Sequence, residues 1–176
     1  MEDLKRLIRS VPDFPKKGIV FRDITTLLKD AGALQKAVEE LAAPFAREKV
    51  DVVVGIESRG FILGGAVACK LGAGFVPVRK AGKLPAETIQ QSYELEYGTD
   101  TLAMHKDAIK PGQKVLMVDD LLATGGTMAA SCHMADELGG KVVACVFLIE
   151  LSFLGGRKKL RPHRVMSLVD YASEAE

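Results

Sequence analysis

Residues 115–127 read Val-Leu-Met-Val-Asp-Asp-Leu-Leu-Ala-Thr-Gly-Gly-Thr. The four apolar residues at the start, two of them β-branched, predict a short buried strand, and two carboxylates, Asp119 and Asp120, follow at its end. A turn of small residues then leads into a segment with helical spacing. In an open parallel α/β sheet, ligands bind beyond the carboxyl ends of the strands, where a helix N-terminus offers free N–H groups to an anion. The stretch therefore predicts an α/β fold with a ligand site at this sheet edge.

The turn itself favours a phosphate. Gly125 and Gly126 allow the backbone to approach a phosphate closely, and the hydroxyls of Thr124 and Thr127 add donors. The two carboxylates before the turn cannot bind phosphate directly. They indicate a ligand that carries hydroxyl groups or a hydrated metal beside its phosphate, which points to a phosphorylated sugar.

The flanking sequence alternates between strand and helix patterns. Helices are predicted over residues 2–10, 32–47, 61–71 and 128–138, and buried strands over 50–56, 75–78, 142–149 and 165–169, with a further edge strand at 102–105. Such alternation is typical of a mostly parallel, doubly wound sheet flanked by helices. A length of 176 residues suits a single domain.

Two more strand-to-helix or strand-to-loop turns carry charge. Glu57-Ser-Arg-Gly60 follows the strand at 50–56, and it is either a second anion-binding turn or a solvated turn with a helix cap. Arg79-Lys-Ala-Gly-Lys83 follows the next strand, and phosphate binding and a plain solvated charged segment are equally good interpretations of it. Residues 84–99 lack a clear period and suggest a long excursion or hairpin, which is often a functional lid.

Composition excludes several classes of protein. A formal net charge of +1 argues against a nucleic-acid-binding surface, and the absence of an apolar run of about 20 residues argues against a membrane span. The first residues lack a secretion signal, so we expect a cytoplasmic protein whose three cysteines are reduced thiols in the core. Neither a dinucleotide-binding Gly-x-Gly-x-x-Gly nor a P-loop is present, which argues against a dehydrogenase or a P-loop kinase.

Residues 115–127 resemble the phosphoribosyl pyrophosphate signature of the type I phosphoribosyltransferases. The resemblance covers at least residues 11–154, and its further motifs are similar to those of the family members that use adenine. These motifs are Phe14-Pro, Gly18-Ile-Val-Phe-Arg-Asp23, Glu57-Ser-Arg-Gly-Phe61, Val78-Arg-Lys with Gly82-Lys-Leu-Pro85, Ser92-Tyr-Glu-Leu-Glu-Tyr-Gly98 and Asp107-Ala-Ile-Lys-Pro-Gly112. Ala81 departs from the basic residue or proline that relatives often carry there.

The resemblance implies a division of the site. The loop of Ala123, Thr124, Gly125, Gly126 and Thr127 would bind the 5-phosphate of phosphoribosyl pyrophosphate, and Asp119 and Asp120 would take the ribose hydroxyls. Glu57, Ser58 and Arg59 would hold the pyrophosphate, with a cis peptide bond between Glu57 and Ser58. Arg79 and Lys83 would also reach the pyrophosphate, Arg79 across the interface of a homodimer. Mg²⁺ would arrive mainly on the substrate, without a direct protein ligand set.

The base would bind in a hood formed by about residues 1–30, against the core of about residues 31–176. There Val20, Phe21 and Arg22 would form the adenine pocket, Phe21 by stacking; from spacing alone, Phe21 fits core packing as well. On the lid, Glu96 would be the catalytic acid that meets the base, and Tyr97 would lie beside it. The implied reaction converts adenine and phosphoribosyl pyrophosphate to AMP and pyrophosphate. Alternatives are an enzyme for xanthine or guanine and a regulatory protein that senses these ligands, although the chain shows no DNA-binding module.

Overall fold

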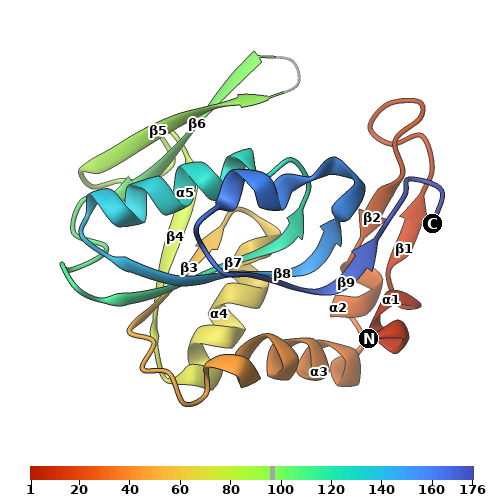
Figure 1. The fold of residues 1–176 in the computed structure, drawn as a ribbon, viewed down its shortest axis with the longest axis horizontal. Helices are drawn as coiled ribbons and strands as arrows, with labels where there is room; N and C mark the ends of the chain where they lie inside the picture. Colours follow the sequence, from red (N-terminus) through yellow and green to blue (C-terminus); the bar gives the residue numbers. More distant parts are fainter. Residues whose placement is uncertain (96–97) are drawn as a thin grey trace.

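A computed structural model describes residues 1–95 and 98–176. Within these residues, seven strands form the central sheet in the order β5-β6-β4-β3-β7-β8-β9 (Figure 1). Five of them run parallel, namely β3 (Val52–Ile56), β4 (Gly74–Lys80), β7 (Lys114–Leu122), β8 (Lys141–Leu151) and β9 (Val165–Tyr171). A hairpin of β5 (Thr88–Leu95) and β6 (Gly98–His105) joins antiparallel to β4. The predicted mostly parallel sheet is confirmed.

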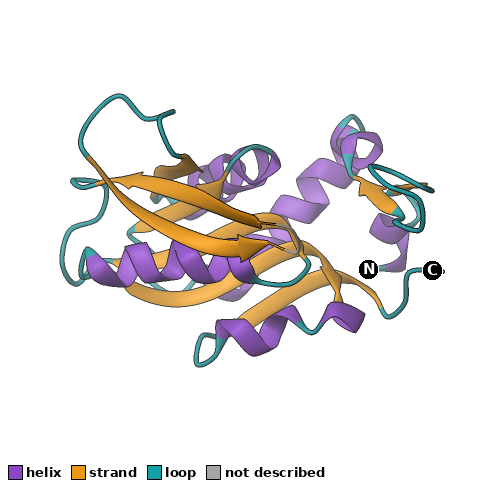
Figure 2. Cartoon of the chain, turned by 90° about the horizontal axis from the view of Figure 1, so that it is seen from above, coloured by secondary structure: helices purple, strands orange, loops and turns teal. Residues whose placement is uncertain are grey.

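Helices cover both faces of the sheet. α3 (Ala31–Ala42) and α4 (Arg59–Leu71) pack on one face, and α5 (Gly126–Glu137) lies on the other (Figures 1 and 2). Short helical segments complete the chain: α1 (Glu2–Lys5), α2 (Thr25–Leu28), η1 (Ala43–Phe45), η2 (Ser152–Leu154) and η3 (Gly156–Leu160). None of the helices in the described ranges has the length and apolarity that crossing a membrane requires.

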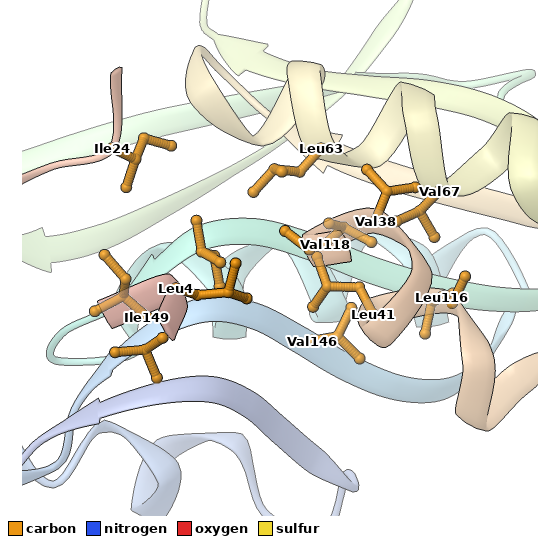
Figure 3. Close-up of a cluster of buried hydrophobic side chains, with 14 of the residues drawn as sticks. Leu4, Ile24, Val38, Leu41, Leu63, Val67, Leu116, Val118, Val146 and Ile149 are labelled. Carbon is orange, nitrogen blue, oxygen red and sulfur yellow. The ribbon is translucent and has the colours of Figure 1, made fainter. Parts of the chain in front are cut away.

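Each face of the sheet has its own apolar core, because side chains of buried parallel strands alternate between the two faces. In β7, Leu116 and Val118 belong to the core beneath α3 and α4, whereas Val115 and Met117 belong to the core beneath α5. Figure 3 shows the first core, in which Leu41 of α3 and Leu63 of α4 lie over the sheet residues. This packing fixes the strands whose ends carry the polar residues.

The hood is a small sheet apart from the central one. β1 (Arg9–Val11) pairs antiparallel with β2 (Phe21–Asp23), and Arg9 forms an ion pair with Asp23. The predicted helix over residues 2–10 is therefore wrong in its second half: it ends at Lys5, and the chain is extended from Arg9 because pairing with β2 overrides the local helical spacing.

Two other predictions need correction. Residues 102–105 are not an edge strand, because β6 lies between β4 and β5 and the excursion after β4 supplies the edge strand β5. Of the three cysteines, Cys132 and Cys145 are buried free thiols with their sulfur atoms 3.5 Å apart, but Cys69 in α4 is exposed. The apolar neighbours of Cys69 in the sequence lie on the other side of that helix.

Candidate active site

The candidate site lies beyond the carboxyl ends of β3 and β7, which are neighbours in the sheet. After β3 the chain enters α4 on one face, and after β7 it enters α5 on the other face (Figure 1). Such a point, where consecutive connections leave on opposite faces, opens a crevice in doubly wound sheets. A cavity of about 350 Å³ occupies it and is lined by residues 56–59, 80, 93, 102, 119–128 and 147.

The predicted phosphate loop, residues 123–127, forms one side of this cavity. Gly125 has a φ of 80°, in the left-handed region that favours glycine, and α5 begins at the next residue. A Cβ atom on Gly125 would lie 2.5 Å from the carbonyl oxygen of Gly156, so the loop backbone packs directly on another loop. The first N–H groups of a helix have no partner within the helix, which makes this loop suited to an anion.

Asp119 and Asp120 lie in the last part of β7, which continues past them to Leu122. Asp120 is buried and pairs with Arg59, whereas the Asp119 carboxylate accepts a 2.9 Å hydrogen bond from the Asp120 N–H. Burial and the neighbouring charge of Asp120 raise the pKa of the Asp119 carboxyl well above its usual value. Gly60 makes this packing possible, since a Cβ atom there would lie 2.7 Å from Oδ1 of Asp119.

The turn after β3 contains the cis peptide bond between Glu57 and Ser58 that the resemblance implied. The Glu57 carboxylate accepts hydrogen bonds from Arg79 Nε at 2.8 Å and from Lys83 Nζ at 2.7 Å. Burial opposes the charge of Glu57, but these two cations outweigh it and lower the pKa of its carboxyl. The side chain of Glu57 therefore holds the two cations, and the register of Ile56 beside Val78 brings them within reach.

The hood residues lie beside the cavity rather than in its lining. The ring of Phe21 contacts Phe14 edge-on at 5.3 Å between centroids, and the Arg59 guanidinium lies 5.3 Å from the Phe21 ring centroid. Phe21 is thus connected to the turn that bears Arg59.

The side chain of Arg22 has a different role from the one a base pocket would suggest. It is 3% exposed, stacks 3.9 Å from the ring centroid of Tyr171, and donates to Ser10 Oγ at 2.6 Å and to the Glu174 carbonyl oxygen at 3.0 Å. The N–H of Val20 also donates to a Glu174 carboxylate oxygen, at 2.5 Å. The hood is therefore fastened to the C-terminal segment, near which it lies in Figure 1.

The predicted catalytic acid Glu96 and its neighbour Tyr97 lie outside the described residues. The hairpin that carries them packs on the phosphate loop: a Cβ atom on Gly126 would lie 3.2 Å from Cδ2 of Tyr93 and 3.5 Å from the carbonyl oxygen of Glu94. Because Tyr93 lines the cavity, the predicted lid already borders the site near the end of β5.

Sequence reasoning gave no individual role to several residues that line the cavity, Lys80, Tyr93 and Phe147 among them. Lys80 forms a 2.9 Å ion pair with Asp100 of β6, which raises the pKa of the lysine and lowers that of the aspartate. The sequence did carry a signal for Lys80: side chains alternate along a strand, so Lys80 points to the opposite face from Arg79. Finding it required knowing that β4 continues to Lys80.

Comparisons with known proteins agree with this geometry. The family model of the phosphoribosyl transferase domain matches residues 25–170. An adenine phosphoribosyltransferase of Geobacter metallireducens is 61% identical over 171 residues, which are 97% of this chain and 100% of that protein.

Two solved structures extend the comparison. The crystal structure of adenine phosphoribosyltransferase from Thermoanaerobacter pseudethanolicus has a TM-score of 0.94 at 55% identity and covers 97% of this chain and 99% of its own. The enzyme from Saccharomyces cerevisiae, complexed with an imino-altritol bisphosphate and adenine, has a TM-score of 0.89 at 42% identity, covering 94% of this chain and 96% of its own. The chain therefore belongs to the adenine phosphoribosyltransferase family.

Proposed function

We propose that this protein transfers the 5-phosphoribosyl group from phosphoribosyl pyrophosphate to adenine, giving AMP and pyrophosphate. The observation that carries the proposal is one cavity lined by a phosphate loop at a helix N-terminus, an aspartate pair and the turn of residues 57–59. The names of relatives that match nearly the whole chain support adenine as the acceptor base rather than guanine or xanthine.

The phosphoribosyl half of the substrate belongs at the end of β7. The backbone N–H groups of residues 123–127 would bind its 5-phosphate, with the hydroxyls of Thr124 and Thr127 as further donors. Asp119 and Asp120 would accept the ribose hydroxyls. Breaking the bond to pyrophosphate builds positive charge on the ribose ring, which these carboxylates would stabilise.

The pyrophosphate half belongs at the end of β3. Ser58, Arg59, Arg79 and Lys83 would neutralise the charge that develops on the leaving group. Arg59 is paired with Asp120, and Arg79 and Lys83 are paired with Glu57, so each cation is held by a carboxylate near the cavity. We propose a homodimer in which Arg79 reaches the neighbouring site. A cytoplasmic location likewise stays a prediction.

The donor atoms of the site fit Mg²⁺ that arrives on the substrate. Mg²⁺ prefers oxygen ligands and is usually held by one or two carboxylates together with substrate phosphates. Asp119 and Asp120 both line the cavity, so their carboxylate oxygens would face the ribose hydroxyls and the Mg²⁺ that the substrate carries. When bound with the substrate, Mg²⁺ would neutralise pyrophosphate charge.

The base would bind under the hood, with Phe21 stacking on the purine and the backbone of Val20 and Arg22 supplying polar contacts, since the Arg22 side chain packs on Tyr171. As one imidazole nitrogen of adenine attacks the anomeric carbon, a proton must leave the ring system. Glu96 is proposed to exchange this proton, a contribution of about 10²–10⁴-fold. Closure of the predicted lid over residues 84–99 would exclude water from the reacting sugar.

The direct test is to incubate the protein with phosphoribosyl pyrophosphate, Mg²⁺ and each purine base, and to follow nucleotide products by chromatography. AMP should form from adenine, and a variant with Asp119→Asn and Asp120→Asn should form far less at the same protein concentration. No AMP at any adenine concentration would contradict the proposal. Faster product formation from guanine or xanthine would assign the chain to a different purine base.

A further inference from the structure

The outer wall of the phosphate loop is the backbone of Gly156, the first residue of η3. A Cβ atom on Gly156 would overlap the carbonyl oxygen of Ala123, and a Cβ atom on Gly125 would lie 2.5 Å from the carbonyl oxygen of Gly156. The two loops therefore touch backbone to backbone, with no side chain between them to absorb a shift. Any displacement of Gly156 is passed directly to the residues that would bind the 5-phosphate.

A network of hydrogen bonds fixes the position of Gly156. Its neighbour Arg157 forms a two-pronged pair with Glu150 of β8, with Nε and Nη2 each 2.6 Å from a carboxylate oxygen. Arg157 Nη1 donates to the Val165 carbonyl oxygen at 2.9 Å, and Nη2 donates to Ser167 Oγ at 3.1 Å. The Ser167 hydroxyl in turn donates to Glu150 at 2.7 Å. One guanidinium thus ties η3 to the carboxyl end of β8 and to the first half of β9.

The chemistry of this network suits positioning. Glu150 is 4% exposed; burial opposes its charge, but hydrogen bonds from Arg157 and Ser167 outweigh burial and lower the pKa of its carboxyl. A guanidinium presents its donors in a rigid planar fork, so a two-pronged pair fixes direction as well as distance. At the other end of η3, Leu160 is buried in the core beneath α5. Both ends of η3 are therefore held, and Gly156 has little freedom.

Glu150, Arg157 and Ser167 are not among the described residues that line the cavity. We infer that Glu150, Arg157 and Ser167 are positioning residues for the 5-phosphate of the substrate, acting through Gly156 on the shape of the phosphate loop. The inference rests on the proposed function only in naming the phosphate as that of a phosphoribosyl group. The inference predicts a selective effect, because the pyrophosphate turn at residues 57–59 connects β3 to α4, and the hydrogen bonds of this network contact neither element.

The test is Arg157→Lys, which keeps the charge and removes the fork. Binding of ribose 5-phosphate and of pyrophosphate to the full chain is measured separately by calorimetry. Ribose 5-phosphate should bind about tenfold more weakly, while pyrophosphate affinity stays unchanged. The KM for phosphoribosyl pyrophosphate should rise and the KM for adenine should not. The matched control is Arg164→Lys, because Arg164 follows in the same segment but pairs with the half-buried Glu48 at 3.5 Å.

An unchanged ribose 5-phosphate affinity, or an equal loss for both ligands, would overturn the inference, since equal loss indicates general destabilisation. If Arg157→Lys does not fold, Ser167→Ala decides, because it deletes one hydroxyl and should give a smaller loss confined to ribose 5-phosphate. Failure of the proposed function is recognised separately: the unmodified protein would then form no AMP, whatever the variants do to ribose 5-phosphate binding.

Discussion

Replacing Gly60 with alanine is expected to reduce catalysis more than stability. Gly60 is the second residue of α4, and a Cβ atom there would lie 2.7 Å from Asp119 Oδ1, 3.2 Å from the Val118 carbonyl oxygen and 3.3 Å from the Asp119 Cα. The backbone of β7 cannot retreat, because β7 is paired on both sides, with β3 and β8. The Asp119 carboxylate must therefore rotate away.

The size of the effect follows from these contacts. Ordinary contacts to a Cβ atom begin at 3.4 Å, so the carboxylate must move by about 0.7 Å. Its hydrogen bond from the Asp120 N–H would be strained or lost. A displacement near 1 Å at a substrate-positioning group can cost up to about 10²-fold in rate. For stability, a gain of up to about 1 kcal/mol in helix propensity offsets only part of an overpacking cost of about 1–3 kcal/mol.

Steady-state kinetics with phosphoribosyl pyrophosphate and a thermal melt of each protein check this expectation. Gly65→Ala is the matched control in the same helix, because a Cβ atom there meets nothing within 4 Å. The control should keep its kcat/KM and gain about 2–4 °C in Tm from helix propensity. A wild-type kcat/KM for Gly60→Ala would refute the reasoning, since the placement of Asp119 would then not matter to the reaction.

Three further predictions concern the cations, the hood and the effect of pH. Glu57→Gln should weaken product inhibition by pyrophosphate several-fold and leave the adenine KM unchanged, because it releases Arg79 and Lys83, the two cations that this carboxylate holds. A change in the adenine KM alone would contradict that assignment. Tyr171→Leu removes the ring on which Arg22 stacks, so the adenine KM should rise while the Kd for ribose 5-phosphate stays constant in calorimetry. The hydrogen bond from Arg9 lowers the pKa of Asp23 from 3.8 to about 2, so the ion pair stabilises the folded state fully above the unfolded pKa and loses that effect as the pH falls toward about 2. The Tm of Asp23→Asn should therefore lie below that of the unmodified protein at neutral pH, and the difference should shrink as the pH is lowered from about 4 to about 2. A difference that stays constant would count against the ion pair.

The parts of the site that lie in one short stretch could be predicted from the sequence. The strand, the aspartate pair and the glycine turn of residues 115–127 are encoded by local pattern, and the structure places them as β7, its last residues and the start of α5. The cis peptide bond after Glu57 came only from the family resemblance. The roles of the site residues stay predictions.

The parts that depend on long-range pairing could not be predicted. The pairing of Arg59 with Asp120 joins residues 61 positions apart, and no local pattern encodes it. β6 lies inside the sheet because the hairpin pairs with β4 through β6 and not through β5. Arg9 is extended because it pairs with Asp23 of β2. Local spacing sets what a segment prefers, while the partners in the sheet decide what it becomes.

The two ion pairs beside the phosphate loop also differ in how the chain can reach them during folding. Arg157 and Glu150 are 7 positions apart and can meet once a single turn closes, whereas Arg59 and Asp120 must close a loop of 61 positions. Closing a longer loop costs more chain entropy, and contacts between distant positions form late when they depend on a completed sheet. The contact of η3 with the phosphate loop can therefore form before Asp120 pairs with Arg59 at the pyrophosphate turn. During refolding, the phosphate loop would then gain hydrogen-exchange protection ahead of the pyrophosphate turn.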